Sequence, residues 1–445
     1  MLEITNTLTG NKEAFAPIEP GLVRLYVCGV TPYDESHIGH GRCYVTFDLL
    51  YRLLNFLGYQ TTYCRNFTDI DDKLINKAAQ QLGDRLRYVE IANNFIKRFH
   101  EDVDALGCLR PTIEPRVTQS MPIIIAFIQK LIDRGYAYEV DGDVYYHVPK
   151  FSGYPKLSKH NLEDLRVGAR VEVSEQKKDP LDFAVWKKES EGDFFQSPWG
   201  WGRPGWHIEC SAMAAHYLGK QIDIHGGGMD LVFPHHDNEI AQSEAISGAP
   251  FVRYWMHNGL VRIGQEKMSK SLGNVFILNQ VFAQYDPMVV RFYFLSHSYR
   301  APLEFSLDGL DGAQTSYARL CRQLGGANIE TVDTETMKKS PTVQAMMVHL
   351  LDDMNTPGAL GALFGRLAEV ASDETERVAV SSFMQQVLGL TLAPLHEKQV
   401  EMTPEIEALM KEREEARAQK DWARADKIRD LLRQMDVDVQ DKKAD

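Results

Sequence analysis

The sequence predicts an α/β fold in which a parallel-sheet domain is interrupted by an inserted subdomain and followed by an all-α helical region. Three observations carry this prediction. Short β-branched apolar segments alternate with helix-periodic stretches in residues 1–122, short strands and turns occupy residues 123–198, and helical periodicity continues throughout after Asp308. Alternating strands and helices are typical of parallel sheets, and helices with short connections are typical of bundles.

The first unit begins with a buried strand at Val23–Val30, which is apolar and rich in β-branched residues. A loop follows, and the apolar periodicity of Val45–Leu57 predicts a helix. Thr61–Cys64 is expected to form a second strand, and Leu74–Leu106 carries helical periodicity with interspersed charges. The junction of the first strand and helix is therefore a candidate nucleotide site.

The later segments complete the domain organisation. Strand and glycine-rich loop signals resume at Ile222–Gly228, so the intervening helix, strands and turns are interpreted as an insertion. Pro404–Asp445 carries ten basic and twelve acidic residues on two expected helices. Helical patterns precede it at residues 309–325, 341–352, 357–371 and 376–391. We expect these parts: residues 1–122 and 199–258 as the two halves of the sheet domain, 123–198 as the insertion, 259–308 as a connecting region, 309–402 as the bundle and 403–445 as the C-terminal helices.

Composition excludes several classes of protein. Of the 445 residues, 44% are apolar and 25% charged, which excludes disordered, collagen-like and disulfide-stapled chains. The net charge of −13 means that a nucleic-acid partner must meet a local basic patch. Six cysteines suit a reducing compartment. The N-terminus lacks a secretory pattern, and the longest apolar stretch, around Pro122–Ile132, is shorter than the roughly 20 residues that cross a bilayer. We expect a cytoplasmic protein without a membrane partner.

The tetrapeptide His37–His40 stands where the loop after the first strand enters a helix. Free backbone N–H groups and the helix dipole favour phosphate there, and Gly39 lets a bulky ligand approach the backbone. Two imidazoles add donors for a polyphosphate. Taken alone, a His-x-x-His tetrapeptide is more often an ordinary surface or capping pair.

A second candidate phosphate-binding segment is Lys267–Asn274, which contains the run Lys-Met-Ser-Lys-Ser and a glycine. Its ammonium and hydroxyl groups can follow a polyphosphate as charge builds in a transition state, although a solvated basic turn is the alternative. Together with His-Ile-Gly-His, this run resembles the two signatures of class I aminoacyl-tRNA synthetases. The resemblance implies a Rossmann-like catalytic domain, followed by a lysine-bearing loop and stem-contact region at 259–308. It implies ATP binding by His37, Gly39, His40, Lys267, Ser269 and Lys270. Of these residues, His37, His40, Lys267 and Lys270 are implied to be catalytic.

A third set of residues suggests metal chemistry. His235 and Glu239 stand at i and i+4, where an imidazole and a carboxylate can share a cation on one helical face. Cys28 ends the first strand, and Cys210 stands in the segment Pro204–Ser211. Two sulfurs, one nitrogen and one carboxylate form a zinc-like set. Spacing alone leaves a structural role for each buried cysteine open.

With all three sets, the sequence is similar to the cysteinyl-tRNA synthetase family. The motifs that carry the similarity are Tyr26–Gly29, His37–His40, Asn66–Lys73, Gly205–Met213, Asp223–Gly228, Phe233–Gln242 and Lys267–Asn274. The similarity implies one Zn²⁺, Mg-ATP, L-cysteine and tRNA(Cys) as ligands, and a monomer. It implies zinc ligation by Cys28, Cys210, His235 and Glu239, and amino-acid contacts by Gly29, Thr31, Thr68, Trp206 and His225.

Zinc suits an enzyme that must select cysteine. It binds thiolate at about 2.3 Å and deprotonates a coordinating thiol, whereas the hydroxyl of serine is a harder and less acidic donor. Ordinary pockets separate near-isosteric side chains by only about 1 to 3 kcal/mol, and the insertion is too short for an editing domain. Because four protein ligands close a tetrahedral site, this function requires five-coordinate zinc or release of Glu239.

Three other functions compete with this interpretation. A related ligase would activate cysteine in the same way and pass it to an amino sugar, as in mycothiol biosynthesis, but it leaves the long helical region without a role. A zinc hydrolase built on His235, His236 and Glu239 leaves Lys267–Ser271 unexplained, and the sequence has no His-Glu-x-x-His helix. A catalytically silent nucleotide-binding paralogue is disfavoured by the complete ATP motifs.

Two features depart from the family pattern. Pro32 stands in the loop before the His-Ile-Gly-His motif, where a small β-branched residue is expected, and Val437–Asp445 lacks an aromatic and basic tail. Basic and aromatic side chains in the preceding helices could still contact an anticodon through phosphates and base stacking, although a solvated helix face is an equal alternative. These side chains are Arg413, Arg417, Lys420, Trp422, Arg424, Lys427 and Arg429.

Overall fold

The computed structural model describes residues 1–162, 176–264, 266–267, 275–325, 331–395, 404–419 and 421–434. It divides the chain into two compact units, Met1–Pro394 and Leu395–Asp445. In the part of the chain that the structure describes, no helix is both long and apolar enough to cross a membrane.

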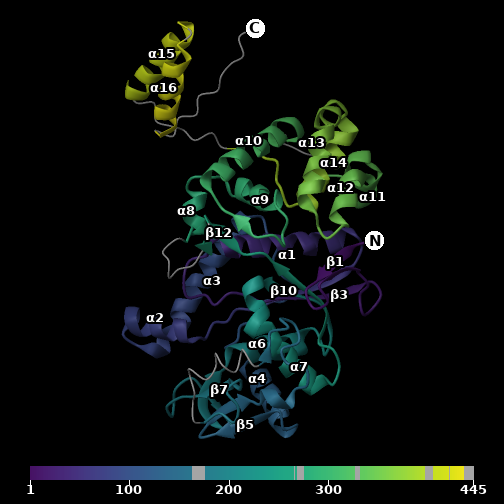
Figure 1. The fold of residues 1–445 in the computed structure, drawn as a ribbon, viewed down its shortest axis with the longest axis vertical. Coiled ribbons are helices and arrows are strands. Elements are labelled where there is room, and N and C mark those ends of the chain that lie inside the picture. The colour runs from purple at the N-terminus through teal and green to yellow at the C-terminus, as the bar shows by residue number, and fades with distance from the viewer. Residues whose placement is uncertain are drawn as a thin grey trace. The chain divides into compact units, whose positions relative to one another are not determined.

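A four-stranded, all-parallel sheet carries the first unit and confirms the predicted α/β class (Figure 1). Its order is β11-β10-β3-β4, formed by Val252–Asn258, Ile222–Gly228, Leu22–Val27 and Gln60–Arg65. The strands are almost fully buried because helices cover the sheet. The carboxyl ends of these four strands therefore meet at one edge, where ligands bind in such folds.

The helices beside this sheet differ from the expected boundaries in physically informative ways. Helix α1, Ile38–Phe56, begins inside the His37–His40 motif rather than at Val45, because His37 and His40 cap it. The periodic stretch Leu74–Leu106 forms two helices, α2 (Asp72–Leu82) and α3 (Tyr88–Ala105). Gly83 ends α2 in a left-handed conformation with φ of 70°, which stops helix propagation.

The predicted insertion and the residues that flank it form helix α4 and a five-stranded antiparallel sheet. Helix α4 is Met121–Asp133, and the strand order is β5-β6-β7-β9-β8. These strands are Ala137–Val140, Asp143–Tyr146, Phe183–Lys188, Gly200–Pro204 and Phe195–Ser197. The chain then returns to the parallel sheet through α6, Trp206–Tyr217, and α7, Asp237–Ser247, lies between β10 and β11.

Smaller elements connect the sheet domain to the bundle. The hairpin β1–β2 is Glu3–Asn6 with Asn11–Ala14, and the sheet β13-β12-β14 joins Glu266–Lys267, Val261–Ile263 and Leu303–Glu304. Two helices, α8 (Leu278–Phe282) and α9 (Pro287–Leu295), lie between β13 and β14 in the sequence. The bundle helices are α10 Leu307–Leu324, α11 Thr334–Lys339, α12 Pro341–Leu350, α13 Thr356–Ser372 and α14 Glu374–Gln386.

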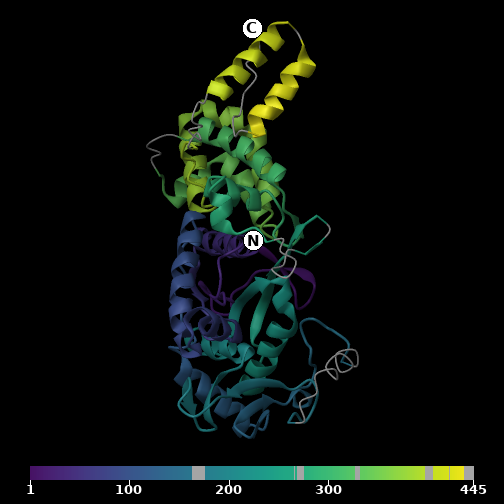
Figure 2. The same cartoon turned by 90° about the vertical axis from the view of Figure 1, so that its left-hand side faces the viewer.

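Within the first unit, the bundle and the insertion lie on opposite sides of the parallel sheet (Figures 1 and 2). The second unit contains α15, Pro404–Ala418, and α16, Trp422–Gln434, which pack through Ile406, Ile428 and Leu432. The all-α character predicted after Asp308 is therefore confirmed for the described residues. The six-part division of the chain stays a prediction.

Candidate active site

Four side chains meet at the carboxyl edge of the parallel sheet, and we call them the sulfur cluster: Cys28, Cys210, His235 and Glu239. Cys28 follows β3 directly, and Cys210 lies on α6. His235 lies in the irregular turn Val232–His236 that leads into α7, and Glu239 lies in the first turn of α7. Their ligand atoms all lie within 4.8 Å of one another, and each side chain is at most 6% exposed.

The geometry of the sulfur cluster can be compared with that of a zinc site. Tetrahedral zinc with Zn–S bonds of about 2.3 Å and Zn–O bonds of about 2.1 Å requires an S···S separation of about 3.8 Å and an S···O separation of about 3.6 Å. The Sγ atoms of Cys28 and Cys210 are 3.8 Å apart, and Cys28 Sγ lies 3.6 Å from Glu239 Oε1. His235 Nε2 and Glu239 Oε1 are closer, at 2.9 Å, as in a direct ion pair. The donor set and these two sulfur distances fit zinc, and the His235–Glu239 pair must open for both residues to bind one ion.

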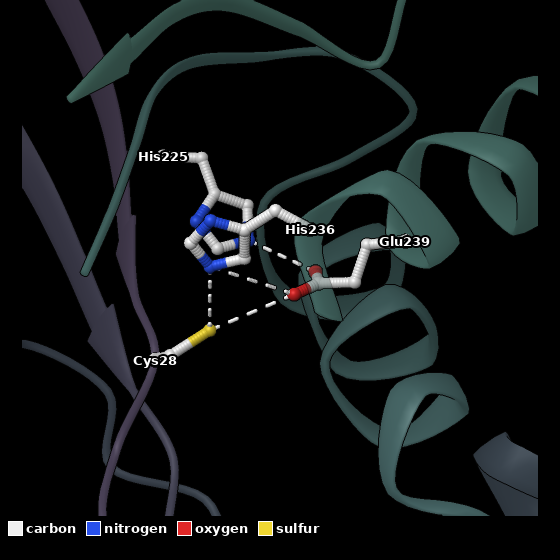
Figure 3. Close-up of side chains that lie close together, drawn as sticks. All are labelled: Cys28, His225, His236 and Glu239. Atoms are coloured by element: carbon white, nitrogen blue, oxygen red, sulfur yellow. Dashed lines mark hydrogen bonds and ion pairs between the residues drawn. The ribbon is translucent and has the colours of Figure 1, made fainter. Parts of the chain in front are cut away.

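A second group overlaps the first, because Cys28 and Glu239 also lie close to His225 and His236 (Figure 3). Glu239 Oε2 lies 2.9 Å from His225 Nε2, and Cys28 Sγ lies 3.3 Å from His236 Nε2. Because this second group has a single sulfur, we interpret His225 and His236 as outer partners of the sulfur cluster. Outer partners of this kind orient metal ligands.

Burial and mutual contact set the charges of the sulfur cluster. The hydrogen bond from Cys28 lowers the pKa of Cys210 to about 6. Although burial opposes ionisation of Glu239, the charges of His225 and His235 lower its pKa to about 2. Burial disfavours the cationic form of His235 too, but Glu239 and Cys210 raise its pKa to about 10. A divalent cation that displaced the His235 proton would therefore meet two anions and a neutral imidazole.

Sequence reasoning missed the residues that support the sulfur cluster. His236 Nδ1 lies 2.8 Å from His257 Nε2, and His257 Nδ1 lies 2.8 Å from Thr7 Oγ1, so a column of side chains runs from Cys28 to the N-terminal segment. His207 Nδ1 lies 3.0 Å from His235 Nδ1. The one available signal was the position of His257 near the carboxyl end of the parallel strand β11, Val252–Asn258.

Several of the residues expected to contact the amino acid lie around this cluster. Thr68 donates to Glu209 Oε2 at 2.9 Å, beside Cys210, and the Trp206 ring packs 4.4 Å from that of His235 while remaining 41% exposed. His225 is fully buried and stacks on Trp255 at 4.6 Å. Thr68 thus contacts the neighbour of Cys210, while Trp206 and His225 contact His235 and Glu239 directly.

The loop after Cys28 holds the remaining two. A Cβ on Gly29 would lie 1.5 Å from the Asn66 carbonyl oxygen, so only glycine fits, and its N–H donates to Asn66 Oδ1 at 3.0 Å. That Asn66 oxygen also lies 3.7 Å from Cys210 Sγ, which ties the loop to the cluster. Thr31 lies farther along, where its carbonyl accepts the Tyr33 N–H.

The second candidate site is the nucleotide end of α1, which comprises His37, Gly39 and His40. His37 caps the helix by accepting the His40 N–H, while His40 Nδ1 accepts the His37 N–H, both at 3.3 Å. The two rings stack 3.7 Å apart with an interplanar angle of 13°. Both are only partly buried, and their helix is 19 residues long. The N-terminus of such a helix attracts phosphate.

The predicted lysine segment is described only at its start. Lys267 lies in β13, where its backbone pairs with Arg262 of β12. Ser269 and Lys270 lie outside the described residues, as does Lys420 among the C-terminal basic residues.

Comparison with known proteins extends over both units. Residues 14–315 match the model of the class I (C) tRNA synthetase catalytic domain, and residues 399–445 match that of the cysteinyl-tRNA ligase anticodon binding domain. A cysteine–tRNA ligase of Geobacillus thermodenitrificans is 48% identical over 99% of this chain and 97% of its own length. One of Geobacter sp. is 46% identical, covering 98% and 97%.

Solved structures share the fold at low sequence identity. Methionyl-tRNA synthetase of Mycobacterium tuberculosis, in complex with methionyl-adenylate, has a TM-score of 0.58 and 14% identity, covering 83% of this chain and 92% of its own. The full-length curated relatives and the two matching domain models together assign the family. The chain belongs to the cysteinyl-tRNA synthetase family of class I aminoacyl-tRNA synthetases.

Proposed function

We propose that this chain is a cysteine–tRNA ligase that activates L-cysteine with ATP and transfers it to the 3′ end of tRNA(Cys). The observation that carries the proposal is the convergence of two thiols, an imidazole and a carboxylate at the sheet edge that also leads into α1. The residue after β3 and the N-terminus of α1 thus present sulfur and phosphate binding groups from one continuous segment. We place the enzyme in the cytoplasm as a monomer.

Selection of cysteine is assigned to the sulfur cluster. A zinc ion held by Cys28, Cys210, His235 and Glu239 would favour the substrate sulfur as thiolate over the hydroxyl of serine. The chain contributes a buried, preorganised donor set, and Trp206 and Thr68 border it. Preorganisation of this kind limits the reorganisation that substrate binding requires.

Glu239 is the ligand that we expect to yield when substrate binds. Its Oε2 is already paired with His225 Nε2 at 2.9 Å, on the side away from His235. If Oε1 leaves its ligand position, the carboxylate keeps this charge-assisted partner and is not left unpaired in a buried site. The arrangement supports a four-ligand site that can open one position.

The nucleotide end of α1 is assigned to ATP. The cysteine carboxylate attacks the α-phosphate in line, and pyrophosphate leaves without a covalent enzyme intermediate. His37 and His40 supply donors at the helix N-terminus, where negative charge is favoured. Lys267 and Lys270, with Ser269, are assigned to the leaving phosphates on the strength of the family resemblance. The terminal ribose hydroxyl of the tRNA then accepts the cysteinyl group from the adenylate.

The proposal is tested by cysteine-dependent ATP–pyrophosphate exchange, measured with serine as competitor and after chelation, and followed by charging of tRNA. We expect exchange and charging with cysteine, no exchange with serine, and loss of exchange on removal of zinc. Exchange without charging would support the amino-sugar ligase. Exchange that survived complete zinc removal would reject selection by the metal.

A further inference from the structure

Arg42 is a buried cation on α1 whose hydrogen-bond partners are backbone carbonyls. It is 2% exposed, lies one turn beyond the nucleotide end of α1, and burial lowers its pKa to about 10. In the part of the chain that the structure describes, no carboxylate forms an ion pair with it. Burying a guanidinium without a counter-ion costs free energy, which its hydrogen bonds must offset.

Five carbonyl oxygens surround this guanidinium, and they come from two chain segments. Nη1 donates to the oxygens of Gly259 and Leu260, at 2.8 and 3.2 Å. Nη2 donates to those of Ser298, Tyr299 and Ala301, at 2.9, 3.2 and 2.5 Å. The first segment leads from β11 into β12, and the second leads into β14. Since β14 pairs with β12, Arg42 holds the base of the small sheet whose third strand contains Lys267.

The same stretch of chain is fixed to α1 again after the lysine segment. The Ile38 N–H donates to the Phe276 carbonyl at 3.0 Å, and the Leu278 N–H donates to the Ser36 carbonyl at 2.9 Å. The chain is thus bonded to Arg42 before Lys267 and to the residues on either side of His37 after Asn274. Both attachments are to the helix whose N-terminus we assign to ATP.

Two further contacts make the Arg42 attachment stiff. A Cβ on Gly259 would lie 2.3 Å from the Ala301 oxygen, so the backbones of the two segments are in direct contact there, and the Gly259 N–H donates to the Tyr299 carbonyl at 2.8 Å. On the other side, Asp353 accepts from Tyr299 Oη at 2.8 Å and from Arg300 Nε at 2.7 Å. The segment Ser298–Ala301 is therefore held between Arg42 and Asp353.

We propose that Arg42 is a positioning residue for adenylate formation, which fixes the base of the β13-β12-β14 sheet relative to the nucleotide end of α1. This inference rests on the proposed function, because it assigns ATP to that end of α1. Arg42 touches no reacting atom. It acts through the placement of β13, which contains Lys267, relative to the nucleotide end of α1, and a displacement of about 1 Å between catalytic groups can cost about 100-fold in rate.

The test compares Arg42→Lys with Arg52→Lys on the same helix. Lysine keeps the charge but cannot present two forked nitrogens to five acceptors. Arg52 is the control on the same helix because it too donates to carbonyls, those of Gly107, Gln385 and Gln386, on the bundle side; unlike Arg42, it also forms an ion pair with Asp48. In ATP–pyrophosphate exchange, we expect Arg42→Lys to lower kcat/KM for ATP by about 10- to 100-fold. The KM for cysteine and the zinc content should stay at the parent values, and Arg52→Lys should leave the ATP kinetics unchanged.

Rescue by added guanidinium ion distinguishes a positioning role from a general loss of stability, because the ion would not restore the rate of a merely destabilised variant. Added guanidinium ion should restore part of the ATP-dependent rate in Arg42→Ala and none in Arg52→Ala. Circular dichroism establishes that each variant is folded. If the Arg42 variants do not fold, Gly259→Ala pushes the same two segments apart and should reproduce the selective loss for ATP.

Two results would overturn the inference. The first is an Arg42→Lys variant that is folded and zinc-loaded and has the kcat/KM for ATP of the parent enzyme. The second is an equal fall of kcat/KM for ATP and for cysteine in both Arg42→Lys and Gly259→Ala. Failure of the proposed function is a separate outcome, because the parent enzyme itself would then show no cysteine-dependent exchange.

Discussion

The sulfur cluster and the nucleotide end of α1 begin on one segment of chain, yet they are built in different ways. The cluster consists of side chains at most 6% exposed, and His207, His225 and His236 contact its members from outside. The nucleotide end of α1 is only partly buried, and its chemistry comes from backbone N–H groups and two stacked rings. Discrimination between near-identical side chains requires fixed donors, whereas a large anion requires access.

The pKa of a buried carboxylate is shifted in opposite directions in the two regions. Both oxygens of Glu239 have imidazole partners, and its pKa falls to about 2 despite burial. Asp102 on α3 lies near Ser36, beside the nucleotide end of α1, and burial raises its pKa to about 6. Its Oδ2 has no hydrogen-bond partner among the described residues. The comparison predicts large functional losses at the cluster and a stability effect at Asp102.

The largest expected effect is that of Cys28→Ser. Serine retains the size of the side chain but replaces a soft ligand by a hard one, so zinc binding and cysteine-dependent exchange should both fall by more than the roughly 100-fold that loss of an outer partner causes. The measurements are zinc content and ATP–pyrophosphate exchange. Cys64→Ala is the control, since Cys64 is buried on β4 outside the cluster. Unchanged zinc content in Cys28→Ser would remove Cys28 from the ligand set.

Sequence could predict this cluster because its members stand in specific motifs. The α/β class, the parallel sheet and the helical region also followed from hydrophobic periodicity. The entry of α1 at His37–His40 was predicted from the motif and not from periodicity. Glycine and histidine break the apolar pattern there, while the capping contacts of His37 and His40 stabilise the first turn. The family resemblance supplied the ligand set, and no periodicity could have brought residues 28 and 210 together.

The next largest effect is expected for His40→Asn at the nucleotide end of α1. Asparagine can still accept the His37 N–H, but the stacked imidazole donor is lost. We expect kcat for exchange to fall by about 100-fold, the cost of removing one transition-state donor, with the KM for cysteine unchanged. His216→Asn, at an exposed position of α6, is the control. A raised KM for cysteine with parent kcat would assign His40 to the amino acid instead.

A smaller effect is expected for His257→Asn, which tests whether outer partners maintain the cluster. His257 joins His236 to Thr7, so its loss should free the imidazole that contacts Cys28. We expect zinc affinity to fall by about 10-fold, measured by competition with a chelator. The cobalt-substituted protein should show altered thiolate-to-metal absorption. If His257→Asn kept the zinc affinity and the cobalt spectrum of the parent protein, the contacts from His236 through His257 to Thr7 would have only a structural role.

The supporting residues were not predictable from sequence for a physical reason. Thr7 and His257 act through contacts between segments up to about 250 residues apart, and no motif of the sequence marks either residue. Arg42 is similar, because its partners are carbonyl oxygens that every residue possesses. Motifs identify groups that perform chemistry, whereas the residues that hold them in place are visible only in the folded chain.

The smallest expected effect concerns stability, at Asp102. In the unfolded chain this carboxyl ionises near its ordinary value of 3.8, but in the folded protein it ionises near 6, so the folded state binds the extra proton between these values. Stability therefore falls as pH rises from about 4 to about 6, and the full penalty, at most about 3 kcal/mol, applies above that range.

Replacing Asp102 by asparagine should remove this penalty, since an amide cannot ionise. We expect Asp102→Asn to raise the free energy of unfolding by about 1 to 3 kcal/mol near pH 7 and to leave it unchanged near pH 4, as measured by urea denaturation of the full chain. Glu101→Gln, at the exposed neighbouring position, should change little. An equal gain at both pH values would mean that shape, not charge, limits this site. A gain in the free energy of unfolding confined to neutral pH would show that the ionised Asp102 carboxylate, beside the nucleotide end of α1, destabilises the fold. The Glu239 carboxylate of the sulfur cluster, in contrast, is stabilised by its imidazole partners.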